Sequence, residues 1–73
     1  MSPLEKIEYA FQTLEDGEIY RSIIEGTERL LIEKALERTR GNQIIAARIL
    51  GLNRNTLRAK IKRLNIQVNQ FRK

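Results

Sequence analysis

The sequence predicts an all-α fold of four helices, two longer ones followed by two short ones. Apolar residues recur at spacings of three and four along most of the chain, which is the period of a helix. Ser2, Asn42 and Asn53 each precede such a stretch and are residue types that favour helix N-caps. Gly17 and Gly41 follow two of these stretches and favour helix ends. These three observations agree on where the helices lie.

The first helix is expected from Pro3 to Leu14, because proline suits the first helical turn and the apolar residues that follow keep the helical period. The second is expected from Glu18 to Thr39. Its interior contains Gly26, which costs about 1 kcal/mol relative to alanine. We interpret Gly26 as a point where another backbone crosses closely, with a local kink as the alternative.

The second helix has two apolar stripes, one more than a surface helix needs. A chain of 73 residues is only marginally stable alone, and without Cys or His it has neither disulfides nor structural zinc. Both facts predict a homodimer in which the first two helices form a shared bundle. The alternative is that the second stripe covers the C-terminal helices. The predicted dimer interface consists of Ile7, Phe11, Ile19, Ile23 and Leu30.

The last two helices are expected at 43–50 and 54–64, joined by a tight turn at 51–53. Short helices joined in this way are typical of a helix-turn-helix. The small residues Ala46 and Ala47 allow close crossing, and the apolar face of the last helix is expected to pack against Ile45 and Ile49.

The chain is therefore expected to be one domain with three segments. These are dimerisation helices at 1–40, a helix-turn-helix unit at 41–66 and a tail at 67–73. For the tail the sequence leaves two alternatives open, a frayed end or an arm that contacts phosphates.

The net charge of +5 is unevenly distributed along the chain. All nine acidic residues lie between Glu5 and Glu37, a region with only four basic residues and a net charge of −5. From Arg38 to Lys73 there are ten basic residues and no acidic one, a charge of +10. A half-chain of this kind indicates a polyanionic partner.

The exposed face of the last helix has the residue types that read double-stranded DNA. Arginine can pair with guanine and asparagine with adenine, and the N-terminal residues of a recognition helix reach furthest into the major groove. The predicted base-contacting residues are Asn53, Arg54, Arg58 and Asn55. The predicted phosphate-contacting residues are Asn42, Gln43, Thr56, Lys60, Lys62 and Arg63.

Specific residues then indicate a family. Arg40-Gly41-Asn42-Gln43, Ala46-Ala47, Gly51, Asn53 to Arg58 and Lys60-Ile61-Lys62 resemble the C-terminal region of the factor for inversion stimulation (Fis). They equally resemble the DNA-binding domains of NtrC-type enhancer-binding activators. The resemblance extends over most of residues 18–66.

This resemblance implies a four-helix Fis-like fold, a homodimer, paired helix-turn-helix units and DNA bending. The residues that match Asn53, Arg54 and Arg58 approach bases in that family, and those that match Asn42, Gln43, Thr56, Lys60 and Lys62 hold phosphates. The chain departs from Fis at Ile44, Ile45 and Ala59, where Fis has Thr, Arg and Lys. We therefore expect weaker nonspecific binding than that of Fis.

Because nothing before Pro3 resembles the N-terminal arm of Fis, the chain looks more like the anchoring domain of an activator than a free-standing Fis-like nucleoid protein. In such activators a separate ATPase domain contacts RNA polymerase carrying the nitrogen sigma factor. The expected location is the bacterial cytoplasm, at the nucleoid.

Other classes of function fit the sequence less well. Without Cys or His most catalytic constellations are missing, and the acidic pairs resemble ordinary surface charges. Single-strand RNA readers stack bases on aromatic residues, and the basic half has only Phe71. The apolar face of the basic region is too sparse for a membrane-surface helix. No cofactor, metal or membrane partner is expected.

Overall fold

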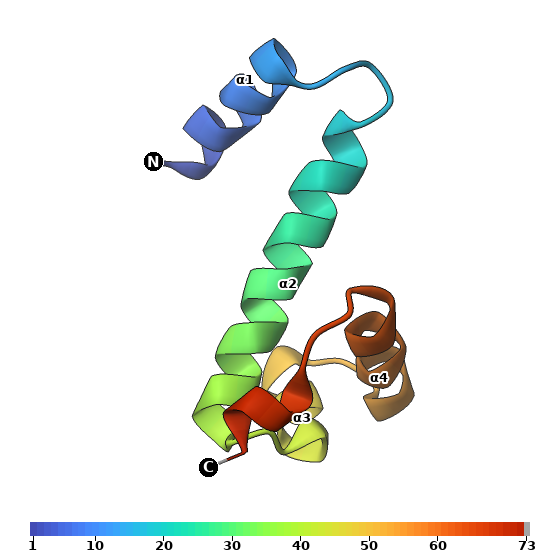
Figure 1. The fold of residues 1–73 in the computed structure, drawn as a ribbon. Coiled ribbons are helices and arrows are strands. Elements are labelled where there is room, and N and C mark those ends of the chain that lie inside the picture. The colour runs from blue at the N-terminus through green and yellow to red at the C-terminus, as the bar shows by residue number, and fades with distance from the viewer. Residues whose placement is uncertain (73) are drawn as a thin grey trace.

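The computed structural model describes residues 1–72 and contains four α-helices followed by a short 3-10 helix, with no strand among those residues. The elements are α1 (Pro3–Thr13), α2 (Ile19–Thr39), α3 (Gln43–Leu50), α4 (Arg54–Arg63) and η1 (Val68–Phe71). The long α2 runs through the molecule, α1 lies beside its first half, and α3, α4 and η1 gather around its second half (Figure 1). The predicted all-α, four-helix architecture is confirmed.

The predicted helix starts are confirmed by their hydrogen bonds. The Ser2 hydroxyl accepts from the backbone N–H of Glu5, whose carboxylate accepts in turn from the N–H of Ser2. These two bonds form a capping box, and the backbone N–H of Ser2, which donates to the carboxylate, lowers the pKa of Glu5. The side chains of Asn42 and Asn53 accept from the N–H groups of Ile45 and Asn55. Helix starts were predictable because each cap lies within three residues of the group it satisfies.

The helices α2, α3 and α4 each end in a Schellman motif, in which a residue with positive φ follows the helix. After α2, the residue with this conformation differs from the prediction. After α2 the N–H of Gly41 donates to Leu36 O (2.8 Å), and the left-handed residue that closes the helix is Arg40 (φ 54°). Gly41 follows with φ 82°, so two consecutive residues have positive φ, not Gly41 alone as the sequence predicted. Gly51, the first residue of the predicted tight turn, closes α3 with φ 75°, and Asn65 closes α4 in the same way with φ 56°.

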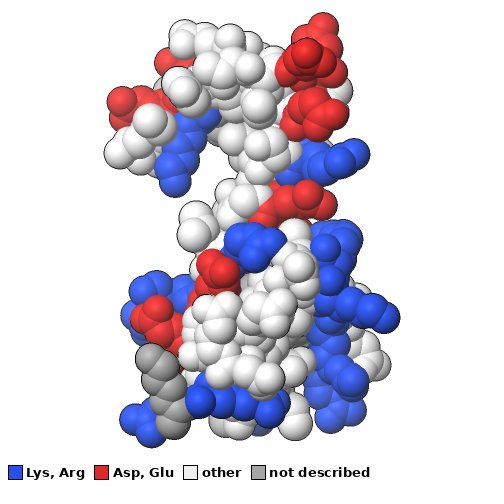
Figure 2. Space-filling view, viewed as in Figure 1, with Lys and Arg blue, Asp and Glu red and all other residues white. Residues whose placement is uncertain are grey.

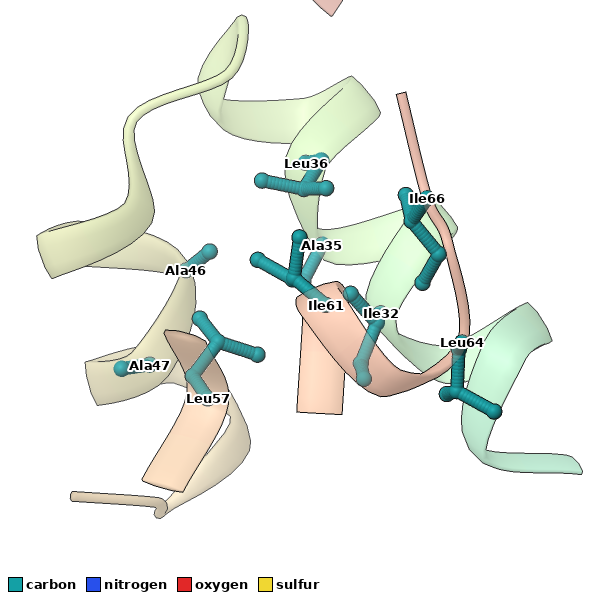
Figure 3. Close-up of a cluster of buried hydrophobic side chains, with 9 residues drawn as sticks. All are labelled: Ile32, Ala35, Leu36, Ala46, Ala47, Leu57, Ile61, Leu64 and Ile66. Carbon is teal, nitrogen blue, oxygen red and sulfur yellow. The ribbon is translucent and has the colours of Figure 1, made fainter. Parts of the chain in front are cut away.

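The hydrophobic core lies where α3, α4 and the C-terminal segment surround the second half of α2. It is built from Ile32, Ala35, Leu36, Ala46, Ala47, Leu57, Ile61, Leu64 and Ile66 (Figure 3). Leu36 and Leu57 are completely buried, and so is Ala46, whose small side chain lets α3 approach its neighbours closely. Because α2 supplies three of these residues, the core extends across the expected boundary at residue 40.

The packing partners of α4 differ from the prediction. Ile45 and Ile49 remain 40 % and 57 % exposed, and the residues of α3 that enter the core are Ala46 and Ala47. The helix α3 has only eight residues and packs against both α2 and α4. The face that meets these two helices is narrow, and Ala46 and Ala47 occupy it. Ile45 and Ile49 consequently lie outside the core.

The C-terminal segment is part of the fold. Residues 68–71 form η1, which packs on α2, and Val68 and Phe71 are half-buried against the core. The frayed end that the sequence left open is therefore wrong for these residues. Lys73, the last residue of the alternative arm, lies outside the described residues.

The N-terminal half has almost no core of its own. Ala10 is the only buried residue of α1, whereas Phe11 and Leu30 are 66 % and 60 % exposed. The predicted close crossing at Gly26 does not occur within the described chain, since a Cβ added there would have no atom within 4 Å. No helix of residues 1–72 combines the length and the apolarity needed to cross a membrane.

The core predicts a large effect of shortening Leu57. Leu57→Ala should lower the free energy of unfolding by about 2–5 kcal/mol, because it removes a completely buried side chain and leaves a cavity. The matched control Ile49→Ala changes an exposed apolar residue and should cost less than about 0.5 kcal/mol. Urea unfolding followed by circular dichroism measures both. Equal losses for the two variants would contradict the location of the core.

Candidate nucleic-acid interface

The candidate site is the face of α4 that points away from the core. Leu57 and Ile61 turn one side of α4 inward, and Asn55, Arg58 and Lys62 lie on its exposed side. A shallow hollow on this face is lined by Asn55, Arg58, Ala59, Ile61 and Lys62 of α4 and by Gln43 of α3. The structure thus brings four predicted site residues, Gln43, Asn55, Arg58 and Lys62, to one place.

The remaining predicted residues at the starts of the two helices are also exposed. Arg54 and Thr56 lie in the first turn of α4, and Asn42 and Asn53 cap α3 and α4. The two caps have a chemical consequence. Because the Asn53 Oδ1 already accepts from the backbone N–H of Asn55, the cap fixes the orientation of the Asn53 amide and uses one of the two lone pairs of its oxygen. The side-chain amide of Asn55 is not needed for the cap.

Two predicted residues point away from this face. Lys60 Nζ lies 2.5 Å from Glu28 Oε2, and Arg63 Nη2 lies 2.9 Å from Glu28 Oε1, with Glu25 at 4.0 Å from Arg63. The Lys60 side chain is only 25 % exposed. Both cations are therefore used to hold α4 against α2. The sequence could not indicate this, because Glu28 is 32 residues from Lys60.

A further α2 side chain completes this connection. Arg29 donates to the carbonyl of Leu64, the residue that ends α4, where a positive charge is favourable. We call the set of Glu25, Glu28, Arg29, Lys60 and Arg63 the α2–α4 clamp. The hydrogen bond from Lys60, aided by the charges of Lys60 and Arg63, holds the pKa of Glu28 below its ordinary value of 4.5 although partial burial opposes this. The clamp fixes the direction of α4 relative to α2.

The charge that remains on the α4 face is uncompensated. Among residues 1–72, no carboxylate oxygen lies within 4.0 Å of a cationic nitrogen of Arg54, Arg58 or Lys62. Figure 2 shows Lys and Arg gathered along the side of the molecule where α4 lies, with most of the acidic surface over α1 and the start of α2. In the same 72 residues, no three carboxylates gather as they would to hold a metal ion.

Comparison with known proteins identifies this part of the chain. Residues 23–64 match the family model described as "Bacterial regulatory protein, Fis family". The chain is 58 % identical over 50 residues to the "DNA-binding transcriptional regulator NtrC" of Azospirillum brasilense and 58 % identical to that of a Bradyrhizobium species. The protein of the same name from Rhizobium meliloti is 54 % identical.

Each of these alignments covers 68 % of this chain but about a tenth of the relative's length. No solved structure matches the chain significantly.

The clamp predicts how stability depends on pH. Because the pKa of Glu28 is lowered in the folded state, the clamp stabilises the protein above the ordinary range of a glutamate and loses this effect as the pH falls through the lowered pKa. Glu28→Gln should therefore lower the melting temperature at pH 7, and the difference from the unmodified chain should vanish in strong acid.

The control for this experiment is Glu15→Gln, which changes an exposed carboxylate in the loop between α1 and α2. Its melting temperature should follow that of the unmodified chain throughout. A deficit of Glu28→Gln that is as large at pH 3 as at pH 7 would show that the ion pairs do not cause it.

Proposed function

We propose that this chain is a sequence-specific double-stranded DNA-binding domain that places α4 in the major groove. The chain belongs to the Fis family of bacterial regulatory proteins. The observation that carries the proposal is the α4 face, where Arg54, Arg58 and Lys62 have no acidic partner among residues 1–72 and lie beside the polar side chains of Asn55 and Gln43. The family and the names of the relatives support DNA-binding transcriptional regulation.

Base reading is assigned by side-chain chemistry. Arg54 and Arg58 can each form two hydrogen bonds with a guanine edge. An asparagine pairs with adenine through both amide atoms, and the amide of Asn53 is held in the orientation that the helix cap requires. Asn55, whose side-chain amide takes no part in the cap, is therefore the better adenine reader, and Asn53 is assigned a single contact through its Nδ2 protons.

Phosphate contacts are assigned to the side chains around this face. Asn42 and Gln43 at the start of α3, with Thr56 and Lys62 of α4, can position the duplex without reading its sequence. Lys60 and Arg63, which the sequence also suggested, are omitted from this set because the clamp holds them against Glu28.

The proposal includes a homodimer formed by α1 and α2. A monomer would leave Ile7, Phe11 and Leu30 between 39 % and 66 % exposed, and the half-buried Ile19 and Ile23 lie on the same two helices. Large apolar side chains exposed together indicate an interface. Two copies would present two α4 helices to successive major grooves, with the DNA bending that the family resemblance implies.

In a longer parent protein this domain would anchor an enhancer-binding activator at upstream sites. The support is the 54–58 % identity to proteins named NtrC, of which the match spans about a tenth. The ATPase domain and RNA polymerase with the nitrogen sigma factor would then be the partners of the whole activator.

DNA binding is tested first by its salt dependence. If the lysine and arginine side chains of each half of a dimer neutralise about four phosphates, log K plotted against log salt concentration should have a slope of about −7, from −0.9 per phosphate. Fluorescence anisotropy with a selected duplex measures the slope. A slope near zero would eliminate the proposed mechanism.

Two single variants distinguish residues that read the base sequence from residues that only position the duplex. Arg54→Ala should cost about 1–3 kcal/mol per half-site and relax the preference for one base pair, because residue 54 could no longer form two hydrogen bonds with a guanine. Lys62→Ala should weaken the selected and the random duplexes equally and make the slope shallower. An unchanged site preference for Arg54→Ala, measured by selection from a random duplex pool, would remove Arg54 from the reading set.

The dimer is tested by sedimentation equilibrium. The unmodified chain should be dimeric at micromolar concentration, and Leu30→Asp should shift it to monomer because a charge enters the apolar interface. Ile49→Asp, which changes a residue of similar exposure on α3, should stay dimeric. A stably folded monomer of the unmodified chain at that concentration would refute the dimer.

A further inference from the structure

The C-terminal segment returns to the turn that precedes α3. Beyond η1, Arg72 lies directly over Gly41, so that a Cβ added to Gly41 would be 2.7 Å from Arg72 Cγ and 3.6 Å from Arg72 N. Gly41 is buried and has φ 82°, which a side chain would strain. Arg72 can therefore occupy this space only because residue 41 has no side chain.

The position of Arg72 is continuous with the proposed DNA interface. Arg72 lines a shallow hollow together with Arg40, Gly41, Asn42, Gln43 and Ile44. Gln43 also lines the hollow on the α4 face, together with Asn55, Arg58 and Lys62. Gln43 thus borders both the hollow that contains Arg72 and the face that holds the proposed base readers.

The charge at this position has no acidic partner among the residues that the structure describes. Among residues 1–72, no carboxylate oxygen lies within 4.0 Å of the cationic nitrogens of Arg72 or Arg40. The nearest acidic residue in sequence to Arg40 is Glu37, which pairs with Lys34 at 3.5 Å. Arg72 is exposed, so its guanidinium can meet a ligand without rearrangement of the core.

We propose that Arg72 is a further phosphate-binding residue of this domain, carried to the DNA backbone by η1. The proposal rests on the DNA-binding function proposed above. In a helix-turn-helix the first helix crosses the backbone that borders the major groove, so a cation beside the start of α3 meets phosphates of the strand next to the bases read by α4. A guanidinium binds a phosphate through two parallel hydrogen bonds, and this interaction carries no sequence information.

η1 holds Arg72 in its position beside Gly41. The half-buried Val68 and Phe71 attach it to the core, and its packing on α2 brings the chain back to residue 41. Without this attachment Arg72 would be one cation on a loose terminus, and the entropy of ordering it would offset much of the gain from binding a phosphate. The segment 68–72 therefore belongs to the DNA-binding unit.

The test compares Arg72→Gln with the unmodified chain on the selected duplex and on a random duplex. The substitution removes one phosphate-binding cation from each half of the dimer, so the salt slope should become shallower by about 2, from 0.9 per phosphate. Both duplexes should bind more weakly by the same factor. Arg72→Lys retains a cation and should restore most of the slope.

Arg21→Gln is the matched control, since it removes one exposed arginine from the first half of α2 and should leave the slope unchanged. An Arg72→Gln slope equal to that of Arg21→Gln would overturn the proposal. A loss of affinity accompanied by a lower melting temperature and an unchanged slope would assign Arg72 a structural role and also overturn it. Absence of salt-dependent duplex binding by the unmodified chain would instead refute the proposed function itself.

Discussion

The burial of apolar surface around the second half of α2 is the interaction on which the rest of the structure depends. Leu36 of α2 and Leu57 of α4 are completely buried there, together with the small Ala46 of α3. Because 73 residues supply only one such core, α1 and the start of α2 have none. The molecule is therefore a packed C-terminal unit that carries two amphipathic helical segments, and it is those segments that a second copy would cover.

The same packing explains how the charges are arranged. Along the sequence, no acidic residue lies among the ten basic residues from Arg38 onward, but in space the carboxylate of Glu28 lies between Lys60 and Arg63. Part of the basic half is thereby neutralised and used to orient α4, while Arg54, Arg58 and Lys62 stay without acidic partners among residues 1–72. A recognition helix needs both features, because its direction must be fixed before its side chains can be complementary to DNA.

The helices and their starts were predictable, whereas the details of packing were not. The caps at Ser2, Asn42 and Asn53 satisfy groups two or three residues away, so the local sequence contains all the information they need. The exposure of Ile49 could not be predicted, because helical spacing does not show which side of a short helix meets two neighbours. The left-handed Asn65 was missed although a signal existed, since asparagine after the last apolar residue of a helix is a recognised stop.

By itself the sequence determined the all-α class, the positions of four helices, the Fis-type signature and the choice of polar residue types on α4. The helices and their caps depend on residues within about four positions of one another. The tertiary structure alone decided which basic side chains are available, because Lys60 meets a carboxylate 32 residues away and Arg72 lies against Gly41. Pairings between residues so far apart in the chain follow from how the helices pack, and helical periodicity carries no information about them.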